Sequence, residues 1–355
     1  MRKFPIYLLV SLLAISNSQS AYSATAKAGA ICSKSGALAT VNKIKYQCTK
    51  TGKKLIWVKV PMAAASPTPT KTDSPSAEVL KVQQLITQLS TKISRTDSPI
   101  QVTLLIDPKL SKSKWSADSV ASIKMALKVL TALDLKPANQ LKLVISQGPE
   151  FRDMHTPESC HWDSGGGSCG QGIMFADLAW FAKSLGYSSG ESSYLSEMDK
   201  FTITANVPHE IGHVAQDAVA ATNNNFNYWK LNPAWLREGS AEIFKLITYS
   251  IDNQIAYIRL HDLYASHLWY GCKDFSLSKL NGQGSYEYGC EYAKGLFATE
   301  LLISKVGSFD ALMNFYKIEG DSTPEIFKKA YKLDLATFEA EADAYFLKVT
   351  KPFYG

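Results

Sequence analysis

The pattern in this chain with the clearest chemical potential is His209-Glu210-Ile211-Gly212-His213. On a helix, residues four positions apart share one face, so the imidazoles of His209 and His213 can reach a single cation. Glu210 then lies beside that cation, where its carboxylate can take a proton from a water molecule. Two surface histidines on an ordinary helix are the alternative interpretation. The pattern predicts a metal-dependent hydrolytic site.

A catalytic zinc normally has three protein ligands and one open position, so a third ligand must come from another segment. The metzincin continuation H-x-x-G-x-x-H is excluded, because Gln216 and Val219 stand at its glycine and histidine positions. The segment from Pro233 to Glu242 instead resembles the W-L-x-E-G-x-A segment of gluzincin metallopeptidases. This resemblance implies that Glu238 is the third ligand of one catalytic Zn²⁺ ion.

Glu242 follows Glu238 by one helical turn and shares its face. It is predicted either to hold a zinc-bound histidine or to be a solvated helix charge. Residues 214–237 make the spacing between His213 and Glu238 longer than in the aminopeptidase branch. The chain therefore resembles gluzincin-like proteins with a minimal, peptidase-MA-like domain.

Two further segments are similar to gluzincins. Tyr292-Ala293-Lys294-Gly295 resembles their Y-x-K-G segment, which implies that the Tyr292 hydroxyl stabilises the oxyanion during attack on the scissile carbonyl. A packing role for this tyrosine stays open. The segment 172–174 faintly resembles the edge strand that binds substrate backbone in that clan, although an ordinary strand explains it equally well.

The elements expected around these residues form a mixed domain over 79–355. Helical periodicity covers 79–93 and about 117–133, strands are expected at 102–106, 141–145 and 172–176, and helical patterns dominate from about 202 onward. With 46% hydrophobic residues in 355, the chain is neither collagen-like nor wholly disordered. Strands followed by helices predict an α+β fold, and the resemblance implies a zincin-like peptidase domain.

The N-terminal part predicts export and a separate small module. Arg2 and Lys3 precede a short apolar run and small residues typical of a signal peptide, assigned to 1–26. Residues 27–60 form a small basic β module, and 61–78 form a linker rich in Pro, Ser, Thr and Ala. No later apolar run is long enough for a membrane helix. The expected location is secreted, extracellular or associated with the cell envelope.

Six cysteines in an exported protein predict disulfides. They fall into three local pairs along the chain, so the expected bridges are Cys32 with Cys48, Cys160 with Cys169, and Cys272 with Cys290. No C-x-x-C occurs, which disfavours metal binding by these thiols.

Charge is distributed unevenly along the chain. The formal net charge is +6, yet residues 27–60 alone hold eight lysines and no acidic residue, so the remainder from 61 onward is net acidic. These lysines predict either a solvated face or a surface for an anionic cell-envelope polymer.

The leading hypothesis from the sequence is an exported zinc metallopeptidase that acts on a peptide or protein. In that hypothesis Glu210 serves as the general base for a zinc-activated water. The alternative is an envelope-binding protein on a catalytically degenerate zincin scaffold. The complete set of His209, Glu210, His213 and Glu238 argues against that alternative.

Overall fold

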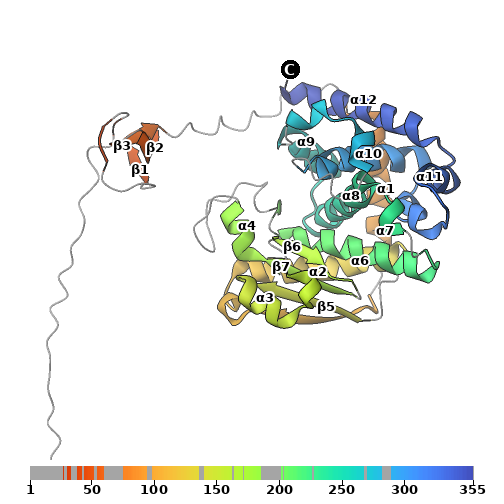
Figure 1. Cartoon of the computed structure of the whole chain (residues 1–355), viewed down its shortest axis with the longest axis horizontal. Helices are drawn as coiled ribbons and strands as arrows, with labels where there is room; N and C mark the ends of the chain where they lie inside the picture. Colours follow the sequence, from red (N-terminus) through yellow and green to blue (C-terminus); the bar gives the residue numbers. More distant parts are fainter. Residues whose placement is uncertain are drawn as a thin grey trace, which may run out of the picture. The chain divides into compact units, whose positions relative to one another are not determined.

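The protein divides into two compact units, Met1–Lys71 and Thr72–Gly355, which are described separately (Figure 1). The structure is a computed structural model. It describes residues 27, 30–32, 38–41, 44–51, 54–59, 75–93, 98–135, 140–161, 164–170, 172–184, 201–202, 204–225, 228–267, 270–281 and 289–354. The predicted signal peptide, 1–26, and residues 61–74 of the predicted linker lie outside the described residues.

The first unit contains a three-stranded antiparallel sheet. Its strands are β1 (Leu38–Val41), β2 (Ile44–Thr51) and β3 (Lys54–Lys59), in that order. Thr51 pairs with Lys54, so only two residues join β2 to β3. Cys48 of β2 is buried and bonded to Cys32, which fixes the preceding segment against the sheet. The prediction of a small β module with a disulfide is confirmed.

The second unit begins with helix α1 (Ala77–Ile93) and a four-stranded sheet. The strands are β4 (Gln101–Ile106), β5 (Gln140–Ser146), β6 (Gly166–Ser168) and β7 (Ile173–Asp177), in the order β4-β5-β7-β6. Helix α2 (Lys114–Ala132) connects the parallel strands β4 and β5. The apolar residues of β5 are mostly buried, as suits an interior strand, whereas β4 lies at the edge and its residues are exposed or half-buried. Two shorter helices follow strand ends, α3 (Pro149–His155) after β5 and α4 (Leu178–Ser184) after β7.

The position of β7 differs from one expectation. The resemblance of segment 172–174 implies an edge strand, but β7 pairs with β5 on one side and with β6 on the other. The two edge strands are β4 and β6; β6 runs antiparallel to β7 and has no further strand partner among the described residues. The continuous apolar sequence of β7 is the pattern of an interior strand, because both of its faces are covered.

The rest of this unit is helical. Its helices are α6 (Asn206–Thr222), α7 (Tyr228–Leu231), α8 (Ala234–Asp252), α9 (Tyr257–His267), α10 (Cys290–Val306), α11 (Thr323–Tyr331) and α12 (Leu335–Tyr354). Short 3-10 helices occupy Pro108–Leu110, Glu158–Cys160, Tyr270–Asp274, Leu277–Asn281, Phe309–Leu312 and Asn314–Lys317. Helix α6 contacts β6, β7 and α2 on one side and α8 on the other, so it joins the sheet to the helical group (Figure 1).

The fold is therefore a mixed α+β arrangement, mostly helical with a small sheet, as the sequence predicts. The two bridges Cys160–Cys169 and Cys272–Cys290 are present with the predicted partners. In the part of the chain that the structure describes, no helix is both long enough and apolar enough to cross a membrane.

A buried polar cluster ties three helices of this unit together. Glu300 of α10 accepts hydrogen bonds of 2.5 Å from the hydroxyls of Tyr257 in α9 and Tyr345 in α12. His261 Nε2 of α9 lies 3.4 Å from Glu300 Oε1, and its Nδ1 lies 3.1 Å from Asp262 Oδ1. Burial alone would lower the pKa of His261, but Glu300 and Asp262 raise that pKa to about 9.

This cluster predicts a loss of stability in mild alkali. A histidine whose folded pKa lies above its unfolded value of about 6.5 stabilises the fold fully below that value. The contribution disappears as the pH rises through about 9. We expect His261→Gln to remove a pH-dependent stabilisation on the order of 3 kcal/mol. Urea unfolding between pH 6 and pH 9.5 measures it, and parallel pH profiles for variant and wild type would contradict it.

Candidate metal centre

Helix α6 supplies both histidines of the site. His209 and His213 lie one turn apart, their ring centroids are 4.7 Å apart, and their Nε2 atoms approach to 3.0 Å. Both rings lie in the buried interface with α8, because Val207, Ile211 and Val214 hold the helix in the core.

Helix α8 brings the third side chain to the same point. Glu238 Oε2 lies 3.2 Å from His213 Nε2 and 3.4 Å from His209 Nε2. A Cβ atom at Gly212 would lie 3.1 Å from the Ala241 Cα, so the glycine of α6 lets α8 pack very closely. The residue that weakens the intrinsic helix propensity of α6 thus allows the crossing that unites the three side chains.

The two histidines are oriented by their other ring nitrogens. His209 Nδ1 lies 2.8 Å from Glu242 Oε1, and His213 Nδ1 lies 2.9 Å from the side-chain oxygen of Gln216. Gln216 in turn donates from Nε2 to the backbone oxygen of Arg237 at 2.9 Å, which fixes the direction of its amide. In the neutral tautomer that metal binding through Nε2 requires, the proton is on each Nδ1 and the Nε2 lone pairs face Glu238.

Glu242 is itself held by two partners that the sequence reasoning missed. Lys245 Nζ lies 2.7 Å from Glu242 Oε2, and the hydroxyl of Tyr264 in α9 donates to the same oxygen. Burial alone would raise the pKa of Glu242, but the charge of Lys245 and the contact with His209 lower that pKa to about 2. Lys245 follows Glu242 by three residues on one helix, and this spacing could have predicted their contact. No sequence feature predicts the contact of Tyr264.

The electrostatics of the cluster favour positive charge between the helices. Burial alone would lower the pKa of His209, but Glu238 and Glu242 raise it to about 10. The pKa of His213 is raised, against the effect of burial, chiefly by the charge of Glu238. The pKa of Glu238 is held well below its usual range by His213 and His209, although burial opposes this.

The residues present fit a metal ion. His209, His213 and Glu238 are all buried and offer three ligand atoms within 3.4 Å of one another. A tetrahedral site with bonds of about 2.0–2.1 Å has ligand atoms roughly 3.3–3.4 Å apart. A cation at this point would replace the protons that the histidines otherwise share with Glu238, so this group can hold a metal ion.

Tyr292 lies on the same side of the fold, at the start of α10. Its ring centroid is 5.7 Å from that of His209, and the side chain is half-buried. The bridge from Cys290 to Cys272 anchors the first residue of α10. A Cβ atom at Gly239 would lie only 2.1 Å from the backbone oxygen of Gly295, so α8 and α10 cross at contact distance. That crossing fixes the start of α10 relative to the ligand helix.

Glu210 points from α6 toward the edge strand of the sheet. The side chain is buried, and burial raises its pKa. A Cβ atom at Gly166 of β6 would lie 3.1 Å from Glu210 Oε1, so the backbone of β6 runs directly beside this carboxylate. All six predicted site residues that are not cysteines therefore lie on α6, α8 and the start of α10, which pack together.

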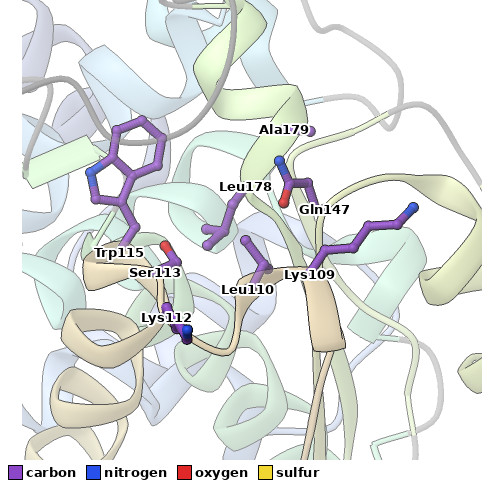
Figure 2. A pocket seen from close by; sticks show the side chains of 8 residues that line it. All are labelled: Lys109, Leu110, Lys112, Ser113, Trp115, Gln147, Leu178 and Ala179. Carbon is purple, nitrogen blue, oxygen red and sulfur yellow. The ribbon is translucent and has the colours of Figure 1, made fainter. Parts of the chain in front are cut away.

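A hollow of about 340 Å³ lies at the carboxyl ends of β4, β5 and β7 (Figure 2). Its lining contains no His, Cys, Asp or Glu and consists of Lys109, Leu110, Lys112, Ser113, Trp115, Gln147, Leu178 and Ala179. None of these residues belongs to the metal cluster, and no other set of three His, Cys, Asp or Glu in the described residues has that geometry.

The chain matches no protein family model and no curated protein sequence. A function for it therefore has to be inferred from its own residues and their arrangement.

The cluster predicts metal-dependent stability and a specific role for Glu242. Added Zn²⁺ is expected to raise the midpoint of thermal unfolding, since a ligand that binds only the folded state stabilises it. Glu242→Gln should lower the Zn²⁺ affinity about 10- to 100-fold, because the carboxylate that orients His209 is lost. Isothermal titration calorimetry with competing chelator measures the affinity.

Glu339→Gln provides a matched control. Glu339 is a buried carboxylate of α12 that accepts hydrogen bonds from Trp235 and Asn281 and belongs to no ligand set. Its replacement should leave the Zn²⁺ affinity unchanged, whereas His213→Gln should abolish stoichiometric binding. Equal affinities for wild type and Glu242→Gln would show that Glu242 does not support the site.

Proposed function

We propose that this chain is an exported, zinc-dependent metallopeptidase of the gluzincin type, with a zincin-like catalytic domain. The observation that carries the proposal is the convergence of His209 Nε2, His213 Nε2 and Glu238 Oε2 within 3.4 Å of one another. The H-E-x-x-H pattern and the segment that resembles W-L-x-E-G-x-A mark the same three side chains as ligands.

Zinc is the metal that this ligand set suits best. Two histidine nitrogens and one glutamate oxygen are typical of catalytic zinc sites that keep one position open. Zn²⁺ bound there would supply a Lewis acid and lower the pKa of water at the open position.

Glu210 is proposed as the general base. Its carboxylate is buried beside the ligand histidines, where it can take a proton from the attacking water and pass it to the leaving amine. The low dielectric of a buried position strengthens its effect on a nearby water molecule. Tyr292, next to the ring of His209, is proposed to donate a hydrogen bond to the oxyanion that forms on the substrate carbonyl.

The edge strand β6 is proposed as the support for an extended peptide. It runs antiparallel at the edge of the sheet, beside Glu210, and its outer side has no strand partner among the described residues. An extended peptide can add to such an edge through main-chain hydrogen bonds. The substrate class that this arrangement favours is therefore a peptide or an extended segment of a protein.

Export is supported by the three disulfides. Bridges of this kind form and persist in oxidising compartments outside the cytosol. The predicted signal peptide at 1–26 agrees with this, so we propose a secreted or envelope-associated enzyme.

The proposed function predicts the behaviour of Glu210→Gln. The variant should keep stoichiometric Zn²⁺, because all three ligands remain, and should lose peptide hydrolysis by a factor of about 100 or more, because no base accepts the proton. The measurements are zinc content by mass spectrometry and cleavage of a peptide library by wild type and variant.

Two results would contradict the proposal. Equal cleavage by wild type and Glu210→Gln would exclude this mechanism. A wild-type protein without zinc, or with zinc but without hydrolysis, would favour a binding protein on a degenerate scaffold. Glu339→Gln again serves as the control, with zinc content and hydrolysis as in wild type.

We further propose that residues 27–60 bind an anionic cell-envelope polymer. This segment holds eight lysines and no acidic residue, while the remainder of the chain from 61 onward is net acidic. Contacts between lysines and a polyanion release counterions, so such binding weakens with salt.

Retention on immobilised polyphosphate tests this partner. The full chain is expected to elute at a higher salt concentration than a variant in which the eight lysines of 27–60 are replaced by glutamine. Retention that is indifferent to salt, or equal for the two proteins, would exclude the segment as the binding surface.

A further inference from the structure

Asn206 carries a buried polar group that the site described so far does not use. It is the first residue of α6 and lies four residues before Glu210, so the two side chains share one face of the helix. The Asn206 Nδ2 atom is buried and has no hydrogen-bond partner among the described residues. A buried donor without an acceptor costs about 1–3 kcal/mol, so such a donor points to a ligand.

The amide of Asn206 faces the edge strand at the point where Glu210 approaches it. A Cβ atom at Gly166 would lie 2.1 Å from Asn206 Nδ2 and 3.1 Å from Glu210 Oε1. Any side chain at this position would displace the amide, so the close approach of β6 to α6 requires glycine. The Asn206 amide and the Glu210 carboxylate therefore both lie beside the backbone of β6 at Gly166.

A second unpartnered group lies on the same face of β6. Side chains alternate along a strand, so Ser168 points to the same side as the Cβ position of Gly166. The Ser168 hydroxyl is buried and also has no partner among the described residues. Gly167, between them, pairs with Phe175 of β7, whereas the backbone N–H of Gly166 donates to the Ser164 hydroxyl, which in turn donates to the Gly166 carbonyl oxygen.

We propose that Asn206 binds the substrate backbone. Its side-chain amide donates a hydrogen bond to a main-chain carbonyl oxygen of a peptide that lies along β6, beside Glu210. An amide suits this position because it donates without adding charge next to the carboxylate. This inference rests on the proposed function, since it assigns the substrate contact of the same site.

The experiment compares two probes on the zinc-loaded full chain. Acetohydroxamate binds the metal and has no peptide backbone, whereas the hydroxamate of acetyl-trialanine adds one. Wild type is expected to bind the peptide probe more tightly. Asn206→Ala should weaken the peptide probe about tenfold and leave acetohydroxamate affinity and zinc content unchanged, which also shows that the variant folds.

Asn223→Ala is the matched control on the same helix. Asn223 is exposed at the far end of α6, where its amide donates to the backbone oxygen of Val219. Its replacement should change the affinity of neither probe. An equal loss for both probes in Asn206→Ala, or no preference of wild type for the peptide probe, would overturn the inference.

Two further outcomes separate this inference from the proposed function. A lower kcat and a shifted pH profile without weaker binding of the peptide probe would make Asn206 a positioning residue for Glu210, which overturns the substrate contact. The wild type could instead hydrolyse no peptide while its affinity for the peptide probe still depends on Asn206. That result would refute the proposed peptidase activity and support the hydrogen bond between Asn206 and the peptide backbone.

Discussion

The constraint on which the site depends is the burial of two carboxylates, one helical turn apart, on the face of α8 that meets α6. Glu238 and Glu242 are each nearly inaccessible to solvent, and burial of unpaired charge would cost several kcal/mol. Both are therefore matched by positive or polarisable partners, with His209 between them. Each carboxylate also has one basic partner: Lys245 lies beside Glu242 Oε2, and Arg237 Nε lies 2.9 Å from Glu238 Oε1, which leaves Glu238 Oε2 beside the two histidines.

The grouping of His209, His213 and Glu238 could be predicted from the sequence because its parts are local. His209 and His213 lie on one helix and Glu238 and Glu242 on another, so helical spacing alone places each pair on one face. The short separations of the cysteines made their pairing predictable in the same way. The type of each element at 79–93, 102–106 and 141–145 followed from strong apolar periodicity.

The supporting groups could not be predicted, since they come together only in the folded chain. Tyr264 contacts Glu242 from another helix. Asn206 could not be linked to the site from the sequence, because only the fold places β6 beside it. The edge strand itself has the sequence Gly166-Gly167-Ser168, which lacks the β-branched and aromatic residues typical of strands. Pairing with β7, not local preference, makes it a strand.

The bridge between Cys160 and Cys169 has a consequence for the entropy of binding. It closes a loop with a sequence separation of nine residues, and the loop contains all of β6. Such a closed loop has few conformations to lose. If a peptide pairs with β6 as proposed, the conformational entropy lost on binding would come mainly from the peptide, because the disulfide already restricts the strand that it joins.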